Sequence, residues 1–354
     1  MGGNEASVRR TFVTPKGRAL DFTRLGFGGA PLGNFPKALS DAEAEAVVQA
    51  AWNAGLRFFD TAPLYGHGLS EQRMGRVLRG QPRDTYLLST KVGRYLEPCA
   101  PGEEDAGIFQ AVPPFRRVYD YSYDGVMRSF EQSLQRLGLD RVDILFVHDT
   151  DARNHGGWAN CEARLHELMG QGGWRALDEL RAGGVVDALG MGVNEWEPCA
   201  WLLERADPDL FLLAGRYTLL EQAPLDGFLP DCERRGVGIV LGGPYNSGIL
   251  ARGPHEGVSF DYAAAPAHVI EQVKKIDAVC RRFDTPMTAA ALQFPGAHPA
   301  VVSVIPGTQS VAELEANVAA QAVAVPPGLW DALRAEGLMH SKAPVPSSEP
   351  AAAC

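Results

Sequence analysis

Four polar side chains lie at, or just beyond, the ends of three predicted strands. Asp60 ends the run RFFD, Tyr65 follows five residues later, Lys91 ends LLSTK and His148 ends ILFVH. A tyrosine, with an ordinary pKa of about 10, is a poor acid–base catalyst at neutral pH unless a nearby cation lowers that value. We expect Lys91 to lower the pKa of Tyr65, and Asp60 to keep Lys91 charged. His148 would then orient or polarise a substrate oxygen. These residue types therefore indicate proton transfer at one site.

A closed parallel barrel would bring these strand ends together. Short apolar runs alternate with amphipathic helical stretches in eight β-then-α units, which predicts a parallel sheet covered by helices. The strand candidates, in order, are LGFG, LRFFDTA, YLLSTKV, VDILFVHD, VDALGMGVN, LFLLAGRY, VGIVLGG and AVVSVIP. Eight such units predict closure into an α/β fold of the (β/α)8 TIM-barrel type, in which active sites lie at the carboxyl ends of the strands.

The competing architecture is a doubly wound dinucleotide fold, which requires Gly-x-Gly-x-x-Gly after a strand. Gly26-Phe27-Gly28 reaches Pro31 at the third glycine position, and Gly190-Met191-Gly192 reaches Glu195, so neither completes the motif. A barrel needs about 250 residues, and the chain has 354. We therefore predict one barrel domain over residues 1–340, with a β-hairpin within residues 8–25. The Pro/Ala/Ser-rich segment 341–354 is expected to be a disordered tail.

Two long segments, 93–121 and 149–173, follow the third and fourth predicted strands and are interpreted as loops over the barrel mouth. Because sugars pack on aromatic faces and bond to nearby polar groups, we expect these loops to supply substrate contacts. The expected substrate-binding residues are Tyr65, His148, Tyr95, Phe115, His155 and Trp158.

Composition excludes several classes of function. Lys and Arg total 33 against 43 Asp and Glu, for a net charge of −10, and no basic run is long enough to follow a nucleic-acid backbone. No stretch approaches the ~20 apolar residues of a membrane helix, and the first residues lack the apolar core of a signal peptide. We therefore expect a cytoplasmic protein with a small-molecule substrate and neither a nucleic-acid nor a membrane partner. The six scattered cysteines are expected to be reduced thiols, and no metal site is predicted.

Several motifs resemble those of the aldo-keto reductase family, over about residues 22–320. They are GLRFFDTAPLYG at 55–66, Ser70-Glu71, Ser89-Thr90-Lys91, Arg136-Leu137-Gly138 with Asp140 through Asp143, His148-Asp149 and Ile305-Pro306-Gly307. The resemblance places the family's Asp, Tyr, Lys and His tetrad on Asp60, Tyr65, Lys91 and His148. It implies hydride transfer between a nicotinamide cofactor and a carbonyl or alcohol without a metal, with Tyr65 as the acid in reduction and the base in oxidation.

The runs at 65–71, 148–151 and 190–196 resemble a sugar-oxidising subgroup that includes L-fucose dehydrogenase and D-threo-aldose 1-dehydrogenase. This resemblance implies oxidation of the anomeric hydroxyl of an aldose of the L-fucose, L-galactose or D-arabinose type to a lactone. A pyridoxal 4-dehydrogenase and a general aldehyde or ketone reductase of the same family are the alternatives. Two other classes stay open, a Schiff-base aldolase using Lys91 and a nucleotide-binding regulatory subunit of a membrane channel.

The same resemblance implies a set of cofactor contacts and a cofactor preference. Gly192 stands where many members have serine, and Tyr245 is a substitute for a missing aromatic residue over the nicotinamide. No Lys or Arg occurs from Phe283 to Leu333, and Glu313 occupies the usual arginine site. A 2′-phosphate is disfavoured there, so NAD is preferred and NADP is possible. The expected cofactor-binding residues are Gly28, Gly29, Asp60, Asn194, Tyr245, Ser247, Gly248, Ile305, Gly307, Thr308, Gln309 and Asn317.

Overall fold

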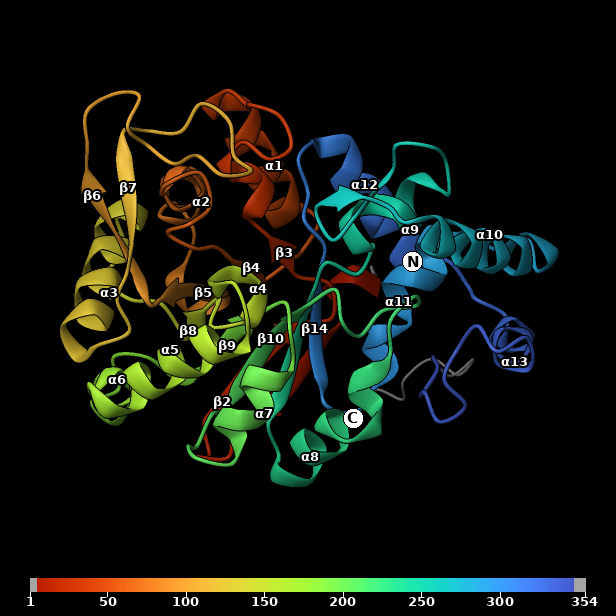
Figure 1. Cartoon of the computed structure of the whole chain (residues 1–354). Helices are drawn as coiled ribbons and strands as arrows, with labels where there is room; N and C mark the ends of the chain where they lie inside the picture. Colours follow the sequence, from red (N-terminus) through yellow and green to blue (C-terminus); the bar gives the residue numbers. More distant parts are fainter. Residues whose placement is uncertain (1–4, 347–354) are drawn as a thin grey trace.

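Eight parallel strands form the centre of the protein, as the alternation of apolar runs predicts (Figure 1). The structure is a computed structural model and describes residues 5–346. Hydrogen-bonded neighbours follow the order β14-β11-β10-β9-β8-β5-β4-β3. The strands are β3 (Phe27–Gly28), β4 (Phe58–Asp60), β5 (Leu87–Val92), β8 (Ile144–His148), β9 (Ala188–Val193), β10 (Leu210–Ala214), β11 (Gly238–Gly242) and β14 (Val301–Ile305).

Contacts between the first and last strands close the barrel. Parallel bridges pair Leu25 with Val304 and Gly28 with Gly307. The amide of Gly26 donates to the carbonyl of Val304 over 2.9 Å, and the Val304 amide donates to the carbonyl of Arg24 over 3.0 Å. The prediction of a (β/α)8 barrel rather than an open doubly wound sheet is therefore confirmed.

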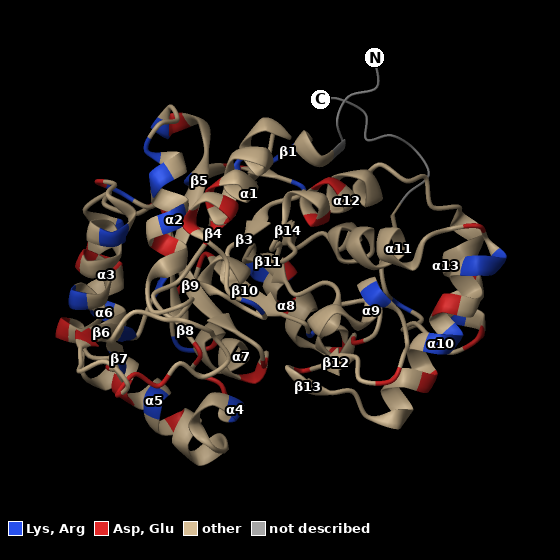
Figure 2. Cartoon of the chain, turned by 90° about the horizontal axis from the view of Figure 1, so that it is seen from above, with Lys and Arg blue, Asp and Glu red and all other residues tan. Residues whose placement is uncertain are grey.

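Helices surround the strands on all sides (Figure 2). Side chains directed into the barrel form one apolar cluster that includes Phe58, Phe146 and Val240, while the outward side chains pack on the helices. Ser40 caps the first helix by accepting from the Glu43 amide, and the Glu43 side chain accepts from the Ser40 amide, which completes a capping box. The helices following the barrel strands are α1 (Asp41–Asn53), α2 (Leu69–Leu78), α3 (Tyr123–Leu137), α6 (Gly173–Ala182), α7 (Glu197–Leu203), α8 (Phe228–Arg235), α10 (Ala267–Arg282), α11 (Met287–Gln293) and α12 (Val311–Gln321).

The predicted N-terminal hairpin is confirmed as β1 (Arg9–Val13) paired antiparallel with β2 (Ala19–Thr23). Its inward residues Leu20 and Phe22 are buried within the barrel cluster. Arg10 donates to the carbonyl of Val301 over 2.6 Å. The hairpin therefore covers the amino-terminal end of the barrel, opposite the predicted site.

The two long segments differ from the loop prediction because each folds locally. Residues 93–121 contain the antiparallel pair β6 (Arg94–Pro98) and β7 (Phe115–Tyr119), which lies beside α3 at the left of Figure 1. Residues 149–173 contain α4 (Ala152–His155) and α5 (Trp158–Gly170). A third excursion after β11 carries α9 (Ile249–Arg252) and the hairpin β12 (Ser259–Phe260) with β13 (Ala263–Ala264).

The structure describes the predicted tail, residues 341–354, only as far as residue 346, and its disorder stays a prediction. After α13 (Pro327–Ala335), Ala343 is 2% exposed and its carbonyl accepts a bond from Arg334 over 2.8 Å. Residues 347–354 lie outside the described residues. Within residues 5–346, no helix is both long and apolar enough to cross a membrane.

Candidate active site

Asp60 and Lys91 form a buried ion pair at the carboxyl ends of β4 and β5. Lys91 Nζ donates to Asp60 Oδ2 over 2.7 Å and to the carbonyl of Thr61 over 2.9 Å. Ser89 Oγ donates to Asp60 Oδ1 over 2.7 Å, so both carboxylate oxygens have partners. Burial raises the pKa of Asp60 and lowers the pKa of Lys91, and the attraction between the two charges opposes both shifts. An ammonium held in this way does not supply the free amine that a Schiff-base aldolase requires.

Tyr65 lies over this pair, on the turn that follows β4. Gly66 has a left-handed φ of +64°, and a Cβ on Gly33 would lie 2.4 Å from the Gly66 amide nitrogen, so two glycines let the turn pack against the loop after β3. Lys91 Nζ is 4.7 Å from the centre of the Tyr65 ring, and the His148 ring centre is 5.8 Å away. The strand ends therefore bring the four predicted catalytic residues together.

The expected lowering of the Tyr65 pKa is not what the structure shows. Burial, followed by the charges of Asp60 and Asp149, raises the pKa of Tyr65 well above its usual value. Lys91 lies over the face of the ring and directs its donors to Asp60 and Thr61 instead of to the hydroxyl. At neutral pH the Tyr65 hydroxyl therefore holds its proton, which suits an acid more than a base.

His148 ends β8 and is almost completely enclosed. Burial, with Arg94 and Lys91 nearby, lowers the pKa of His148 well below its usual value, so the imidazole is neutral near pH 7. Its Nδ1 is buried and has no hydrogen-bond partner among the described residues, and its Nε2 lies 3.5 Å from Asp149 Oδ1. A neutral imidazole in this position can donate to, or accept from, an oxygen of a small molecule beside Tyr65.

The sequence analysis did not assign Asp149 or Arg94 to the site. Arg94 Nη2 donates to Asp149 Oδ2 over 2.6 Å, and Arg94 is 1% exposed. His148 ends β8 and Asp149 follows it directly. The expectation that strand ends meet at one site, which selected His148, could therefore also have selected Asp149. Arg94 gave no such signal, because it lies in a segment interpreted as an irregular loop.

The residues expected to bind substrate are mostly placed elsewhere. Tyr95 packs under Arg128 of α3, with 3.9 Å from the guanidinium carbon to the ring centre, and Phe115 pairs with Pro98 at the far end of the β6–β7 ladder. Trp158 begins α5 and is 43% exposed. His155 Nε2 lies 2.9 Å from the carbonyl of Asp149, so this ring contacts the backbone behind the site. Only Tyr65 and His148 of the expected set face each other.

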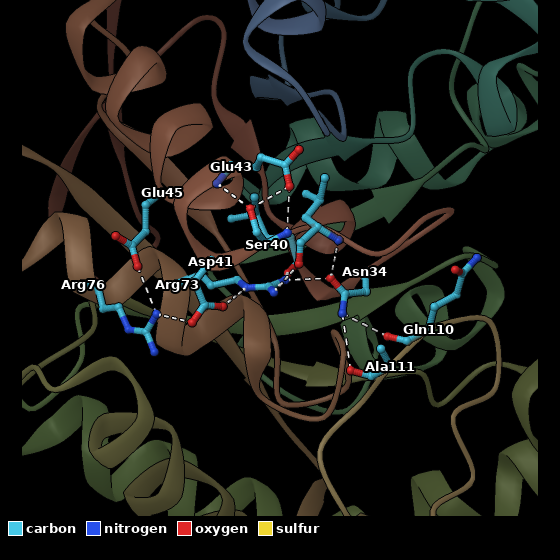
Figure 3. A network of polar contacts seen from close by, with 11 residues as sticks. Asn34, Ser40, Asp41, Glu43, Glu45, Arg73, Arg76, Gln110 and Ala111 are labelled. Carbon is cyan, nitrogen blue, oxygen red and sulfur yellow. Dashed lines mark hydrogen bonds and ion pairs between the residues drawn. The ribbon is translucent and has the colours of Figure 1, made fainter.

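Phe109, on the β6–β7 loop, takes the place expected for Tyr95 or Phe115. It is 6% exposed, and its ring centre is 6.3 Å from that of Tyr65. Asn34 Nδ2 donates to the carbonyls of Gln110 and Ala111 over 3.0 and 3.4 Å, which docks this loop against the segment after β3 (Figure 3). Arg73 of α2 in turn donates to Asn34 Oδ1 over 2.8 Å.

The expected cofactor residues fall into two groups around the mouth. In the first group, Tyr245 Oη donates to Asn317 Oδ1 over 2.9 Å, and Asn317 Nδ2 lies 3.4 Å from Thr308 Oγ1. Gln309 lies beside them and donates to the carbonyls of Phe35 and Lys37. These residues join α12 to the loops after β3 and β11.

The residues of the second group are more dispersed. Asn194 follows β9 and donates its amide to Asp151 Oδ2 over 2.9 Å, while Ser247 Oγ accepts from the Tyr262 amide over 3.0 Å. A Cβ on Gly29 would lie 2.6 Å from the carbonyl of Asp60, so this glycine packs behind the site. Gly28, Ile305 and Gly307 form the seam between β3 and β14, and Gly248 begins α9.

The loops that follow β10 and β11 approach each other closely. Gly215 and Gly243 have left-handed φ values of +72° and +59°, and a Cβ on Gly243 would lie 3.4 Å from the Gly215 amide, so no side chain separates the two backbones. Asn246 donates from Nδ2 to the carbonyl of Gly215, is 3% exposed, and its Oδ1 finds no hydrogen-bond partner in the described chain. An unused acceptor of this kind suits a carboxamide such as that of nicotinamide, which carries two donors.

The charge around α12 also bears on the cofactor. Glu313 Oε2 accepts from the Gln309 amide over 2.7 Å, and α12 carries acidic residues without a basic one (Figure 2). Two basic residues outside the segment 283–333 lie in the segments after β3 and β11. The carbonyl of Lys37 accepts from Gln309, and Arg252 donates to the carbonyl of Ser247 over 2.9 Å.

Comparison with known proteins defines the class to which this fold and site belong. The Aldo/keto reductase family matches residues 24–335, and the chain belongs to that family. It is therefore an oxidoreductase of a family that uses nicotinamide cofactors.

Individual relatives cover almost the whole chain. Identity is 43% to a pyridoxal 4-dehydrogenase from Microbacterium luteolum, over 90% of this chain and 95% of the relative. It is 40% to a D-threo-aldose 1-dehydrogenase from a Pseudomonas species, over 88% and 93%. The holo form of the aldo-keto reductase AKR11C1 from Bacillus halodurans matches with a TM-score of 0.70 at 25% identity, over 96% and 99% of the two chains. The resemblance to the family, with sugar-oxidising members among the relatives, is thereby confirmed.

Proposed function

We propose that the protein oxidises the anomeric hydroxyl of a cyclic aldose to the lactone with NAD. The observation that carries the proposal is the placement of Tyr65 over the buried Asp60–Lys91 pair and beside the neutral imidazole of His148. The name of the D-threo-aldose 1-dehydrogenase relative, 40% identical, supports an aldose. The expected substrates are of the L-fucose, L-galactose and D-arabinose type.

Each residue has a distinct part in the reaction. His148 donates from Nε2 to the substrate oxygen and fixes its position, and Tyr65 Oη takes the hydroxyl proton. A nicotinamide dinucleotide, when bound, accepts the hydride from the anomeric carbon, which becomes the lactone carbonyl carbon. The Asp60–Lys91 pair holds an ammonium 4.7 Å from the Tyr65 ring centre, and the guanidinium of Arg94 favours the phenolate that takes up the proton. In the reverse direction Tyr65 gives the proton back.

We infer that NAD is preferred to NADP. The carboxylate of Glu313 occupies the start of α12, and the sequence from Phe283 to Leu333 supplies no Lys or Arg. A charge-assisted hydrogen bond is worth about 1.5–3 kcal/mol, so a 2′-phosphate without such a partner forfeits about 10- to 100-fold in affinity. Lys37 and Arg252 are the residues through which NADP could still be accepted.

Oxidation of pyridoxal is the second candidate, favoured by the 43% identity to a pyridoxal 4-dehydrogenase. Pyridoxal carries an aldehyde next to a hydroxymethyl group and closes to a cyclic hemiacetal. It therefore presents the same reacting unit as an aldose, a carbon that carries one hydrogen, one hydroxyl and a ring oxygen. The two candidates differ in what surrounds that carbon, aliphatic hydroxyls in one case and an aromatic ring in the other.

A screen of NADH formation separates these possibilities. The panel contains L-fucose, L- and D-galactose, D-arabinose, L-xylose and pyridoxal, each measured with NAD and with NADP. We expect at least one aldose to be turned over, with kcat/KM for NAD about 10-fold or more above that for NADP. Turnover of pyridoxal alone would overturn the aldose as substrate. Equal or better kcat/KM with NADP would overturn the cofactor preference.

A further inference from the structure

Asp149 is a buried carboxylate in the mouth that the four-residue proton-transfer arrangement does not use. It follows His148 directly, is 6% exposed, and its φ of +49° lies in the left-handed region. Backbone of this kind persists where surrounding contacts hold it, and such positions gather at ligand sites. We therefore expect surrounding contacts to hold Asp149 in this conformation.

Three contacts fix the backbone of Asp149. Its amide donates to the carbonyl of Gly192 over 3.0 Å. Its carbonyl lies 2.9 Å from His155 Nε2 and 3.2 Å from Tyr121 Oη, and the same tyrosine hydroxyl lies 2.9 Å from the carbonyl of His148. Loops from three parts of the barrel thus set the position of one carboxylate beside the tetrad.

The two carboxylate oxygens of Asp149 are used unequally. Oδ2 accepts from Arg94 over 2.6 Å, whereas the only ion-pair contact that Oδ1 makes with a described side chain is His148 Nε2 at 3.5 Å. Asp60 differs, because Ser89 and Lys91 occupy both of its oxygens at 2.7 Å. Asp149 therefore retains acceptor capacity at Oδ1, on the side that faces the imidazole that would hold the substrate oxygen.

Arg94 supplies the positive charge beside this buried carboxylate. Its guanidinium lies 4.6 Å from the Tyr119 ring centre as well as bonding to Asp149. Burial raises the pKa of Asp149, and the charge of Arg94 opposes that shift and favours the ionised carboxylate. A carboxylate with spare lone pairs bonds to hydroxyl donors and gains nothing from an apolar group. The carbon that reacts beside His148 in an aldose has such a donor on its neighbour, the 2-hydroxyl.

We propose that Asp149 determines substrate specificity by accepting a hydrogen bond from the hydroxyl next to the reacting carbon. The proposal rests on the proposed oxidation of aldoses. In this proposal the Arg94–Asp149 pair selects hydroxylated substrates, and Tyr65 transfers the proton.

The test is a cycle that removes each partner in turn. Kinetic constants are measured for an aldose and its 2-deoxy analogue, with wild type and Asp149→Asn. Asn keeps the shape and tolerates the left-handed backbone. We expect deletion of the hydroxyl to lower wild-type kcat/KM about 10-fold or more, mostly through KM, and the variant to lose most of this discrimination. The same two proteins are compared in the reduction of a non-hydroxylated aldehyde with NADH, so that any general effect of the substitution on Tyr65 or His148 is divided out of the discrimination.

Asp143→Asn is the matched control. Asp143 also pairs with an arginine, the half-buried Arg83 at 2.8 Å, but it precedes β8 at the other end of the barrel. We expect this variant to lower stability and to keep the wild-type discrimination. The proposal would be overturned if wild type and Asp149→Asn discriminated equally between the aldose and its 2-deoxy analogue. It would also be overturned if wild type turned over both sugars equally well, and this second result does not depend on whether the variant folds. Failure to turn over any aldose would instead overturn the proposed function.

Discussion

Tyr65 lies among charges that oppose one another. Burial is the largest influence on its pKa, and burial, Asp60 and Asp149 favour the phenol, whereas Arg94 favours the phenolate. The result is a pKa well above the usual value of about 10. A tyrosine that holds its proton is ready to donate it in reduction, but must first lose it to act as a base in oxidation.

Oxidation should therefore depend strongly on pH. Below the pKa of Tyr65, the phenolate fraction falls about tenfold for each unit of pH, so log kcat/KM for oxidation should rise with a slope near 1 from pH 6 through pH 9. Reduction should be nearly constant over the same range. Initial rates in both directions measure the two profiles. An oxidation profile that levels off near pH 7 would show that the Tyr65 pKa is lowered in the working enzyme, as the sequence alone suggested.

The sequence predicted where the four tetrad residues lie, but it did not predict where the surrounding aromatic residues lie. Both outcomes have the same physical cause. Asp60, Lys91 and His148 lie on strands, and a barrel fixes where strand ends go. Tyr95, Phe115 and Trp158 were chosen for residue type within segments interpreted as loops, where the direction of a side chain depends on pairing that composition does not reveal. Phe109 reaches Tyr65 because Gln110 and Ala111 bond to Asn34, a contact across 76 and 77 residues of chain.

At the scale of elements, α2 connects the first helix, the loop after β3 and the β6–β7 loop through one guanidinium. Arg73 is 4% exposed and donates to Asp41 Oδ1 over 2.9 Å and to the carbonyls of Leu32 and Leu39 over 2.6 and 2.8 Å, besides Asn34 (Figure 3). The planar group meets four acceptors at once, which an ammonium cannot match. This network supports the loop that carries Phe109 over Tyr65.

Arg73→Lys should therefore lower both stability and activity. Each buried acceptor left unpaired costs about 1–3 kcal/mol, so we expect the free energy of unfolding to fall by at least about 2 kcal/mol, with a lower kcat/KM as Phe109 loses its support. Urea unfolding and steady-state kinetics measure the two effects. Arg76→Lys is the control, because Arg76 lies on the same helix and pairs with the same Asp41 but is exposed, and it should cost at most about 1 kcal/mol. Equal losses in the two variants would contradict this role of Arg73.

Helices and strands with a clear pattern of apolar residues were predicted from the sequence, and those flanked by glycines were not. The eight barrel strands and the start of α1 at Ser40 follow from continuous apolar runs and a capping residue. The helix α5 was interpreted as loop because glycines surround it. Gly157, with φ +127°, precedes its first residue, and Gly172, with φ +82°, separates it from α6. Here the glycines mark the ends of a helix rather than a flexible segment.

At the scale of the whole molecule, the order of the parallel strands makes residues distant in sequence into one site. Asp60, Lys91 and His148 lie at the carboxyl ends of the neighbouring strands β4, β5 and β8. The pairing of β3 with β14 closes the barrel, and β1 and β2 cover the opposite end. The sequence predicted closure from the count of units, but it did not predict that the segments after β5 and β8 would fold into β6–β7 and α4–α5.

The most direct measurement of the central claim compares NADH formation by wild type and Tyr65→Phe with the aldose that wild type turns over fastest. Phenylalanine keeps the ring over Lys91 and beside His148 and removes only the hydroxyl. The account predicts a loss of about 10²- to 10⁴-fold in kcat with NAD affinity unchanged within about twofold, because the hydroxyl moves a proton and does not hold the cofactor. Retention of most of the wild-type kcat would contradict the assignment of Tyr65 as the proton-transfer residue, and with it the proposed mechanism.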